Sequence, residues 1–300
     1  MTTTATPSPD SAPVPNPAWR GSATTLAPLA IIVGFIAFTY RAAAVDAWGL
    51  WMTDPASAHC LFILPIVIAL CWILRDRIRA AATEPSWTGF ALVTIGLIVN
   101  LIATYAHIRW VPLVSLVAVV AGLIIGLHGQ ALWRVVRFPV LFLVFLSPPP
   151  ATLVTPAAVT IQQWSTAGAV ASLTAAGLPV AQNGFFIDTP TISVEVTRDC
   201  SGFNKLTSLL AFSVLYGYLY ALPWKRRLLL VAAVLPVALF ANVLRIFALV
   251  VVGSTWGVGA LHSFHDSAEV LVVVVSFVML TLVGKGLGCN ELRDDQIKQS

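Results

Sequence analysis

The sequence predicts an all-α polytopic membrane protein of about eight transmembrane helices with a small extracytoplasmic β-hairpin. Three observations predict this fold class. Of the 300 residues, 58% are hydrophobic and only 10% are charged, whereas an ordinary soluble domain carries roughly 25% charged residues. Apolar stretches recur that approach the roughly 20 residues needed to cross hydrocarbon. Residues 192–197 instead alternate apolar and polar side chains, as a strand does.

The composition also excludes several classes of function. The formal net charge of +4 comes without a basic arm, so no nucleic-acid partner is expected. Four cysteines without a CxxC pair do not make a disulfide scaffold. The sequence contains neither an HExxH motif nor a phosphate-binding loop. We therefore expect no metal and no cofactor, and the lipid bilayer is the expected surrounding.

Three parts are expected along the chain. Residues 1–25 are rich in Ser, Thr, Pro and Ala and predict a disordered lead rather than a signal peptide. Residues 26–287 form the multi-span membrane domain, and residues 288–300 form a cytoplasmic tail. Helices are predicted for the spans because backbone groups in hydrocarbon must be bonded within their own segment. The spans lie at about residues 26–45, 58–74, 87–105, 110–127, 132–147, 202–222, 228–252 and 267–286.

Basic residues predict the orientation of these spans. They cluster in the links after the second and sixth spans, at the start of the fifth span and in the C-terminal tail. Placing these regions in the cytoplasm puts the N-terminus there as well, so 12 of the 17 Lys and Arg residues lie inside. The start of the sixth span, the end of the seventh and the start of the eighth then meet at the outer face of a cytoplasmic membrane.

A long segment at residues 148–200 is expected outside. After a triple-proline break, residues 157–178 show a helical pattern interrupted by Gly168, and their polar side chains predict an interfacial or partly buried helix. The alternation at 192–197 pairs with residues 184–188 across a turn near Pro190, which predicts a hairpin.

Cys200 follows this hairpin where the sixth span begins. The positive end of a helix dipole favours the thiolate form of a cysteine. Ser201 and Gly202 allow close approach of a backbone, and free N–H groups there can hold an oxyanion. The alternative interpretation is a buried and unreactive cysteine, the usual fate of this residue type.

Asn242 and Arg245 lie three residues apart in the seventh span and therefore share a helix face. An arginine within a span costs about 2.5–3.5 kcal/mol on insertion scales and usually lines a cavity or a site. The pattern favours a site, and the alternative is an arginine that snorkels to the interface.

His262 and His265 precede the eighth span, in the stretch LHSFHDSAE. Imidazole is the side chain best suited to move a proton at neutral pH, so either histidine is a candidate acid/base. Glu269 shares the face of His265 if the helix has begun by then. The alternative is an ordinary histidine in a wet loop. His59, at the start of the second span, can line the same cavity or simply face the interface.

Taken together, a cysteine, an arginine and a histidine from distant parts of the chain are predicted at one membrane face. The set supplies a nucleophile, a charge stabiliser and a base. At this point the chain resembles the exosortase/archaeosortase family. The resemblance covers roughly residues 57–286 and rests on Cys200-Ser201-Gly202, the N-x-x-R of Asn242 and Arg245, and Phe264-His265-Asp266. SAH at 57–59 and the run FPVLFLVFLSPPP are also similar.

The resemblance implies a membrane cysteine transpeptidase or protease that cleaves C-terminal sorting signals of exported proteins. Such signals consist of a short motif, a membrane helix and a basic tail. It further implies that Cys200 is the nucleophile, that Arg245 stabilises charge and that His265 is the acid/base. Two positions depart from the family pattern: Arg198 replaces a common glutamate, and Cys60 replaces a glycine after His59.

Two other classes of function stay open on the sequence. In a transporter, Arg245 and His265 would bind a substrate or move protons, and the thiol would be dispensable. A non-catalytic assembly partner for surface polysaccharide export would tolerate the loss of all three polar residues.

Overall fold

The computed structural model describes residues 23–54, 57–147, 151–197, 203–220 and 222–289 of the chain. It divides into two units, residues 1–42 and 43–300. Helix α1 (Ala23–Thr53) begins in the first unit and ends in the second. Most of the predicted lead and of the predicted tail lies outside the described residues. The candidate site belongs to the second unit.

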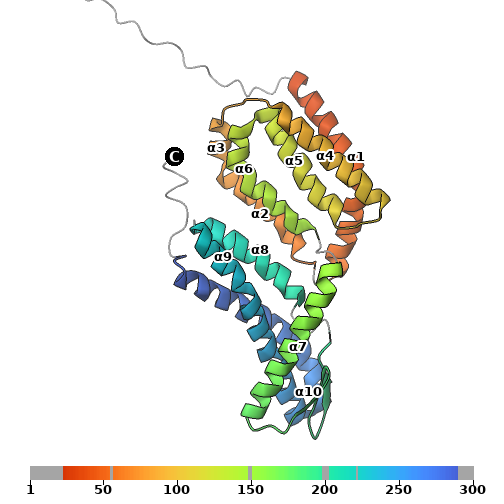
Figure 1. Cartoon of the computed structure of the whole chain (residues 1–300), viewed down its shortest axis with the longest axis vertical. Helices are drawn as coiled ribbons and strands as arrows, with labels where there is room; N and C mark the ends of the chain where they lie inside the picture. The colour runs from red at the N-terminus through yellow and green to blue at the C-terminus, as the bar shows by residue number, and fades with distance from the viewer. Residues whose placement is uncertain (1–22, 55–56, 148–150, 198–202, 221, 290–300) are drawn as a thin grey trace, which may run out of the picture. The chain divides into compact units, whose positions relative to one another are not determined.

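Residues 60–146 form a series of helices joined by short connections (Figure 1). Helices α4 and α5 pack closely because glycines let their backbones approach. A Cβ atom on Gly89 would lie 2.5 Å from the carbonyl oxygen of Gly122, and one on Gly96 would lie 2.7 Å from a methyl group of Val119. The elements are α2 (Cys60–Ile73), α3 (Arg75–Ala80), α4 (Trp87–Tyr105), α5 (Val111–His128), α6 (Gln130–Phe142) and the 3₁₀ helix η1 (Leu143–Leu146).

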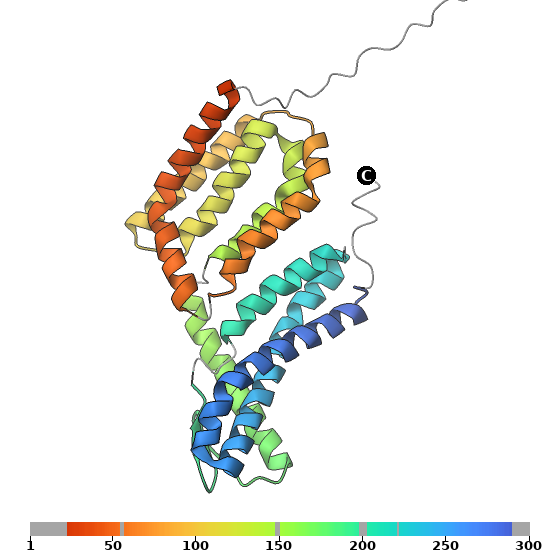
Figure 2. The ribbon, with the colours of Figure 1, turned by 180° about the vertical axis from the view of Figure 1, so that it is seen from behind.

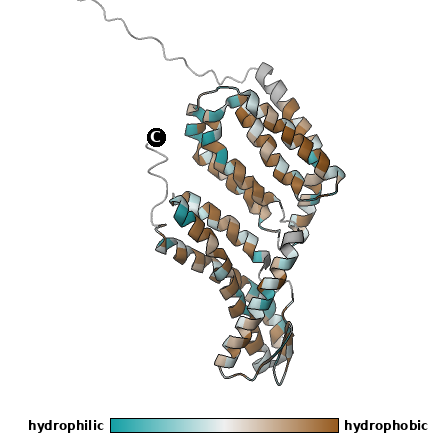
Figure 3. Ribbon diagram, in the orientation of Figure 1, coloured by the Kyte–Doolittle hydropathy of each residue, from teal (hydrophilic) through white to brown (hydrophobic). Residues whose placement is uncertain are grey.

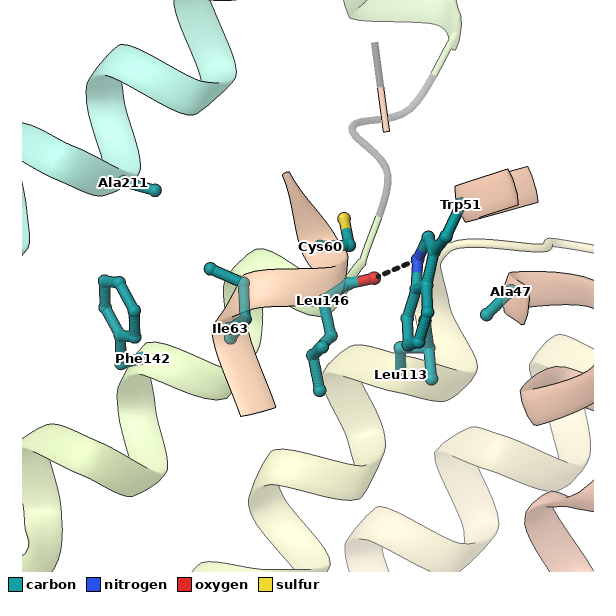
Figure 4. Packing of buried hydrophobic residues seen from close by; sticks show 8 residues of the cluster. All are labelled: Ala47, Trp51, Cys60, Ile63, Leu113, Phe142, Leu146 and Ala211. Carbon is teal, nitrogen blue, oxygen red and sulfur yellow. Dashed lines mark hydrogen bonds between the residues drawn. The ribbon is translucent and has the colours of Figure 1, made fainter. Parts of the chain in front are cut away.

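A core cluster of apolar side chains ties α1, α2, α5 and η1 together (Figure 4). Trp51 lies against Leu146 and donates its indole N–H to the carbonyl oxygen of that residue at 3.3 Å. Cys60 is buried in this cluster, and its thiol donates to the carbonyl oxygen of Phe145. Cys60 therefore packs as a small apolar residue.

Helix α7 (Ala151–Ala175) opens the second half of the chain and is followed by a three-stranded sheet. The predicted hairpin is present: β2 (Phe186–Asp188) pairs antiparallel with β3 (Ser193–Glu195), with Ile187 opposite Val194. The turn closes with a hydrogen bond from the Thr189 N–H to the Ile192 carbonyl at 2.8 Å. A third strand, β1 (Ala181–Asn183), pairs with β2 and was not predicted.

Gly168 does not interrupt α7, contrary to the expectation from the sequence. The helix is continuous, and the glycine lies where α7 approaches the long helix α10 (Val234–Gly286). A Cβ atom at Gly168 would lie 2.9 Å from a methyl group of Val243. The polar residues Ser165 and Thr166 of α7 are fully buried, and the Thr166 hydroxyl donates to the carbonyl oxygen of Gln162 one turn earlier.

Helices α8 (Phe203–Leu219) and α9 (Trp224–Ala232) lead into α10, which contains one break. Gly257 has φ 84° and ψ 177°, a conformation that favours glycine. It divides α10 into a first limb, residues 234–256, and a second limb, residues 258–286 (Figure 2). The link between the predicted spans at 228–252 and 267–286 is therefore helical apart from one glycine, and the helix resumes before the histidines.

Among the described residues, five helical segments are long and apolar enough to cross a membrane, and Figure 3 shows hydrophobic residues along them. The chain is thus a multi-span membrane protein, but the count of about eight spans is not confirmed. Helix α2 has 14 residues, which at 1.5 Å each give roughly 21 Å, short of the about 30 Å of hydrocarbon. The five segments are Ala30–Thr53, Trp87–Tyr105, Val111–His128, Trp224–His265 and Ser267–Gly286.

Candidate functional site

The break at Gly257 brings Arg245 and His265 together. Residues 20 apart in a straight helix would be separated by about 30 Å. Instead, Nη2 of Arg245 on the first limb lies 3.4 Å from Nε2 of His265 on the second limb. A guanidinium is a donor only, so Arg245 is the donor in this contact and Nε2 of His265 accepts.

Arg245 and Asn242 form a buried polar face on the first limb. They are 2% and 1% exposed, so Arg245 does not snorkel to the surface. Among the described residues, Nε and Nη1 of Arg245 and both polar side-chain atoms of Asn242 have no hydrogen-bond partner. An unsatisfied buried polar group costs about 1–3 kcal/mol. These atoms are available to a group outside the described residues.

The two histidines of LHSFHDSAE differ in position. Both lie on the second limb of α10, but His265 is partly buried beside Arg245, whereas His262 is exposed. Three residues on a helix rotate a side chain by about 300°, which leaves the two on related but distinct faces. The contact with Arg245 therefore singles out His265 as the candidate acid/base.

The predicted nucleophile Cys200, with Ser201, Gly202 and Arg198, lies outside the described residues. The chain on both sides of this segment is described. On the N-terminal side, the Gln162 side-chain amide of α7 donates to the carbonyl oxygen of Val196. Val196 is buried in one cluster with Ile246, the residue after Arg245.

On the C-terminal side of the same segment, Lys205 of α8 forms an ion pair with Glu269 of α10. Nζ of Lys205 lies 2.9 Å from Oε1 of Glu269. Glu269 is four residues after His265, so the two share a face of the second limb. The described residues on the two sides of Cys200 thus lie against α10: Val196 shares a core cluster with Ile246, and Lys205 pairs with Glu269.

A cavity of about 310 Å³ adjoins the ion pair and contains His59 in its wall. A second cavity of about 190 Å³ shares His59, Phe62, Ser208 and Phe277 with it. His59 therefore faces a cavity bounded by α2, α8 and α10, while its neighbour Cys60 packs into the core.

Lys205 and Gln162 are two residues of this region to which the sequence assigned no role at the site. The sequence did contain an indication for both, because each is a polar side chain within a largely apolar helix. Their partners could not be read from the sequence, since each partner lies on a different element.

These features define a multi-span membrane protein with a buried arginine–histidine pair where two helical limbs meet. The family model described as "Transmembrane exosortase" matches residues 51–282. The chain belongs to the transmembrane exosortase family. Neither curated proteins nor solved structures give a match to the chain.

Proposed function

We propose that this chain is a membrane-embedded cysteine transpeptidase or protease. It cleaves the C-terminal sorting signals of exported proteins, which consist of a motif, a membrane helix and a basic tail. The observation that carries the proposal is the contact of Arg245 with His265 within apolar helices. Both residue types serve acyl transfer, one as a charge stabiliser and the other as an acid/base. Membership of the transmembrane exosortase family supports the same class of reaction.

Cys200 is the nucleophile in this proposal. His265 accepts the thiol proton, and the sulfur attacks the scissile carbonyl carbon to give a tetrahedral oxyanion. The oxyanion collapses, the C–N bond breaks, and the imidazolium of His265 protonates the leaving amine. An amine or a water molecule then attacks the thioester and gives its proton to His265. The thiolate leaves and recovers that proton.

Arg245 supplies the charge that the oxyanion needs. In the resting state its Nη2 donates to an unprotonated Nε2 of His265, because a guanidinium cannot accept. Once Nε2 takes the thiol proton, it can no longer accept a hydrogen bond from Nη2 of Arg245. Nη2 is then free to donate to the oxyanion as it forms. The buried Nε and Nη1 are further donors without partners among the described residues. Asn242, one turn away, orients the same substrate carbonyl.

The reaction is proposed at the outer face of the cytoplasmic membrane, because most basic residues then lie in the cytoplasm. Single cysteines at Asn183 and Trp256, both exposed, test this orientation in a thiol-free background. An impermeant maleimide should label both in intact spheroplasts. Labelling only after lysis would reverse the orientation.

Cys200→Ser tests the nucleophile. The change keeps the size of the side chain, but a hydroxyl is far less ionised near neutral pH, so processing should fall below detection. The assay is release of the C-terminal helix from a tagged substrate, followed by immunoblotting. Cys71→Ser, which changes a partly buried thiol of α2, is the matched control and should process normally. Full processing by the Cys200→Ser variant would point to the transporter or the assembly partner instead.

Arg245→Lys tests the charge stabiliser. Lysine keeps the charge but not the planar fork, so it cannot reproduce two parallel donors. Loss of one oxyanion donor typically costs 10²–10³-fold in rate, and a loss of about 10²-fold is expected with normal amounts of inserted protein. An unchanged rate would exclude Arg245 from the reaction.

A further inference from the structure

We propose that Lys205 and Glu269 are positioning residues that hold the start of α8, and with it the Cys200 segment, against the limb that carries His265. The proposal rests on the proposed function. Lys205 is five residues after Cys200, and Glu269 is four residues after His265. Their ion pair therefore joins the two stretches of chain that must meet for proton transfer.

The setting of the pair argues for a specific role. The Lys205 side chain is 12% exposed and that of Glu269 is 47% exposed, in helices that are otherwise apolar. Charged side chains within membrane segments are costly and usually functional. Arg245 and His265 lie within electrostatic range of Glu269, so the pair belongs to the polar cluster around the candidate acid/base.

The described chain before Cys200 has a contact of its own. The Gln162 amide holds the carbonyl of Val196. Loss of the ion pair would leave that hydrogen bond and the packing of Val196 in place but release the start of α8. The expected defect is thus a poorly placed thiol in a folded protein.

The matched comparison is the ion pair of Asp46 and Arg109, at 3.9 Å, with side chains 61% and 73% exposed. An exposed pair contributes little, and this one lies outside the proposed site. Removing its two charges therefore serves as the control, because it takes away one acidic and one basic side chain, as the test variant does.

The test measures the rate at which iodoacetamide alkylates Cys200 in the full chain in membranes, followed by mass spectrometry. This reaction needs no substrate. Lys205→Met/Glu269→Leu removes both charges of this half-buried pair, and apolar replacement of an ion pair often leaves stability unchanged. We expect alkylation and substrate processing to fall about tenfold, within the range for residues of one ion pair. Asp46→Leu/Arg109→Met should stay within about twofold of the parent.

Rescue distinguishes positioning from general damage. The single variants Lys205→Glu and Glu269→Lys should be impaired, and the combined charge swap should recover most of the alkylation rate. Normal alkylation in the apolar double variant, or no recovery in the swap, would overturn the proposal. Processing by the Cys200→Ser variant would refute the proposed function alone, because the alkylation comparison does not depend on it.

Discussion

The α4–α5 and α7–α10 interfaces both depend on glycine for close approach, but they bury different chemistry. Gly89 and Gly96 of α4 meet the backbone and side chains of α5, and Gly168 of α7 meets Val243 of α10. Within α4 and α5, no buried side-chain nitrogen or oxygen lacks a hydrogen-bond partner, whereas α7 and α10 contain several such atoms. They belong to Ser165, Asn242, Arg245 and Ser276.

This difference distinguishes residues that only pack helices together from polar residues that the proposed function uses. Small residues alone are enough to bring membrane helices together, as α4 and α5 do. Unsatisfied polar atoms add nothing to that packing and cost free energy when buried. Helices α7 and α10 carry such atoms and α4 and α5 do not, so the apolar pair serves as an internal reference for what packing alone requires.

The largest expected effect tests the chemical side of the comparison. His265→Ala should reduce processing by 10²–10⁴-fold, the usual contribution of a general acid/base, while the amount of inserted protein stays normal. His262→Ala is the matched control from the same limb and should remain within about twofold, because His262 is exposed. Equal losses in both variants, measured by substrate immunoblotting, would remove the distinction between the two histidines.

An intermediate effect tests the packing side. Gly89→Ala places a methyl group against the backbone of α5, which cannot rotate away, so α4 and α5 must separate. Overpacking of this kind costs typically 1–3 kcal/mol. The midpoint of thermal unfolding in detergent should fall, and processing should fall only in proportion to the folded protein. A large loss of processing at an unchanged midpoint would mean that the α4–α5 interface also serves the reaction.

The smallest effect is expected at Gly168. The methyl group of Gly168→Ala would meet the Val243 side chain, which can change rotamer, and alanine favours a helix over glycine by about 1 kcal/mol. These terms oppose each other, so the unfolding midpoint should barely move. Gly168→Leu provides the contrast, since it must push α7 away from Val243, the residue next to Asn242 on α10. Normal processing by that variant would show that the spacing of these helices is irrelevant.

Patterns that are local in the sequence predicted the fold well. The alternation at residues 192–197 predicted β3 and its pairing with β2, because period two is a property of the strand itself. Strand β1 was missed because Ala181, Gln182 and Asn183 do not alternate in polarity. The predicted spans end at 252 and resume at 267, whereas α10 is broken only at Gly257. Only the backbone conformation shows that one residue, Gly257, is enough to reverse the helix.

The candidate site was predicted in part, for a similar reason. The distribution of basic residues predicted that Arg245 and His265 meet at one membrane face, and the two side chains are in contact. The pairing of Lys205 with Glu269 depends on the angle between α8 and the second limb. The sequence alone does not predict that angle. The choice of His265 over His262 depends on the helical phase beyond Gly257. The sequence leaves open where that helix begins, so it does not give the phase.

The reversal at Gly257 also determines when, during synthesis of the chain, the candidate site can assemble. Protein synthesis proceeds from the N-terminus, so Cys200 and Arg245 leave the ribosome before the residues that follow Gly257. The second limb must be made and must fold back before Arg245 has its histidine and Lys205 has its glutamate. Under the proposed function, a growing chain is therefore inert toward its substrates until the second limb of α10 has folded back.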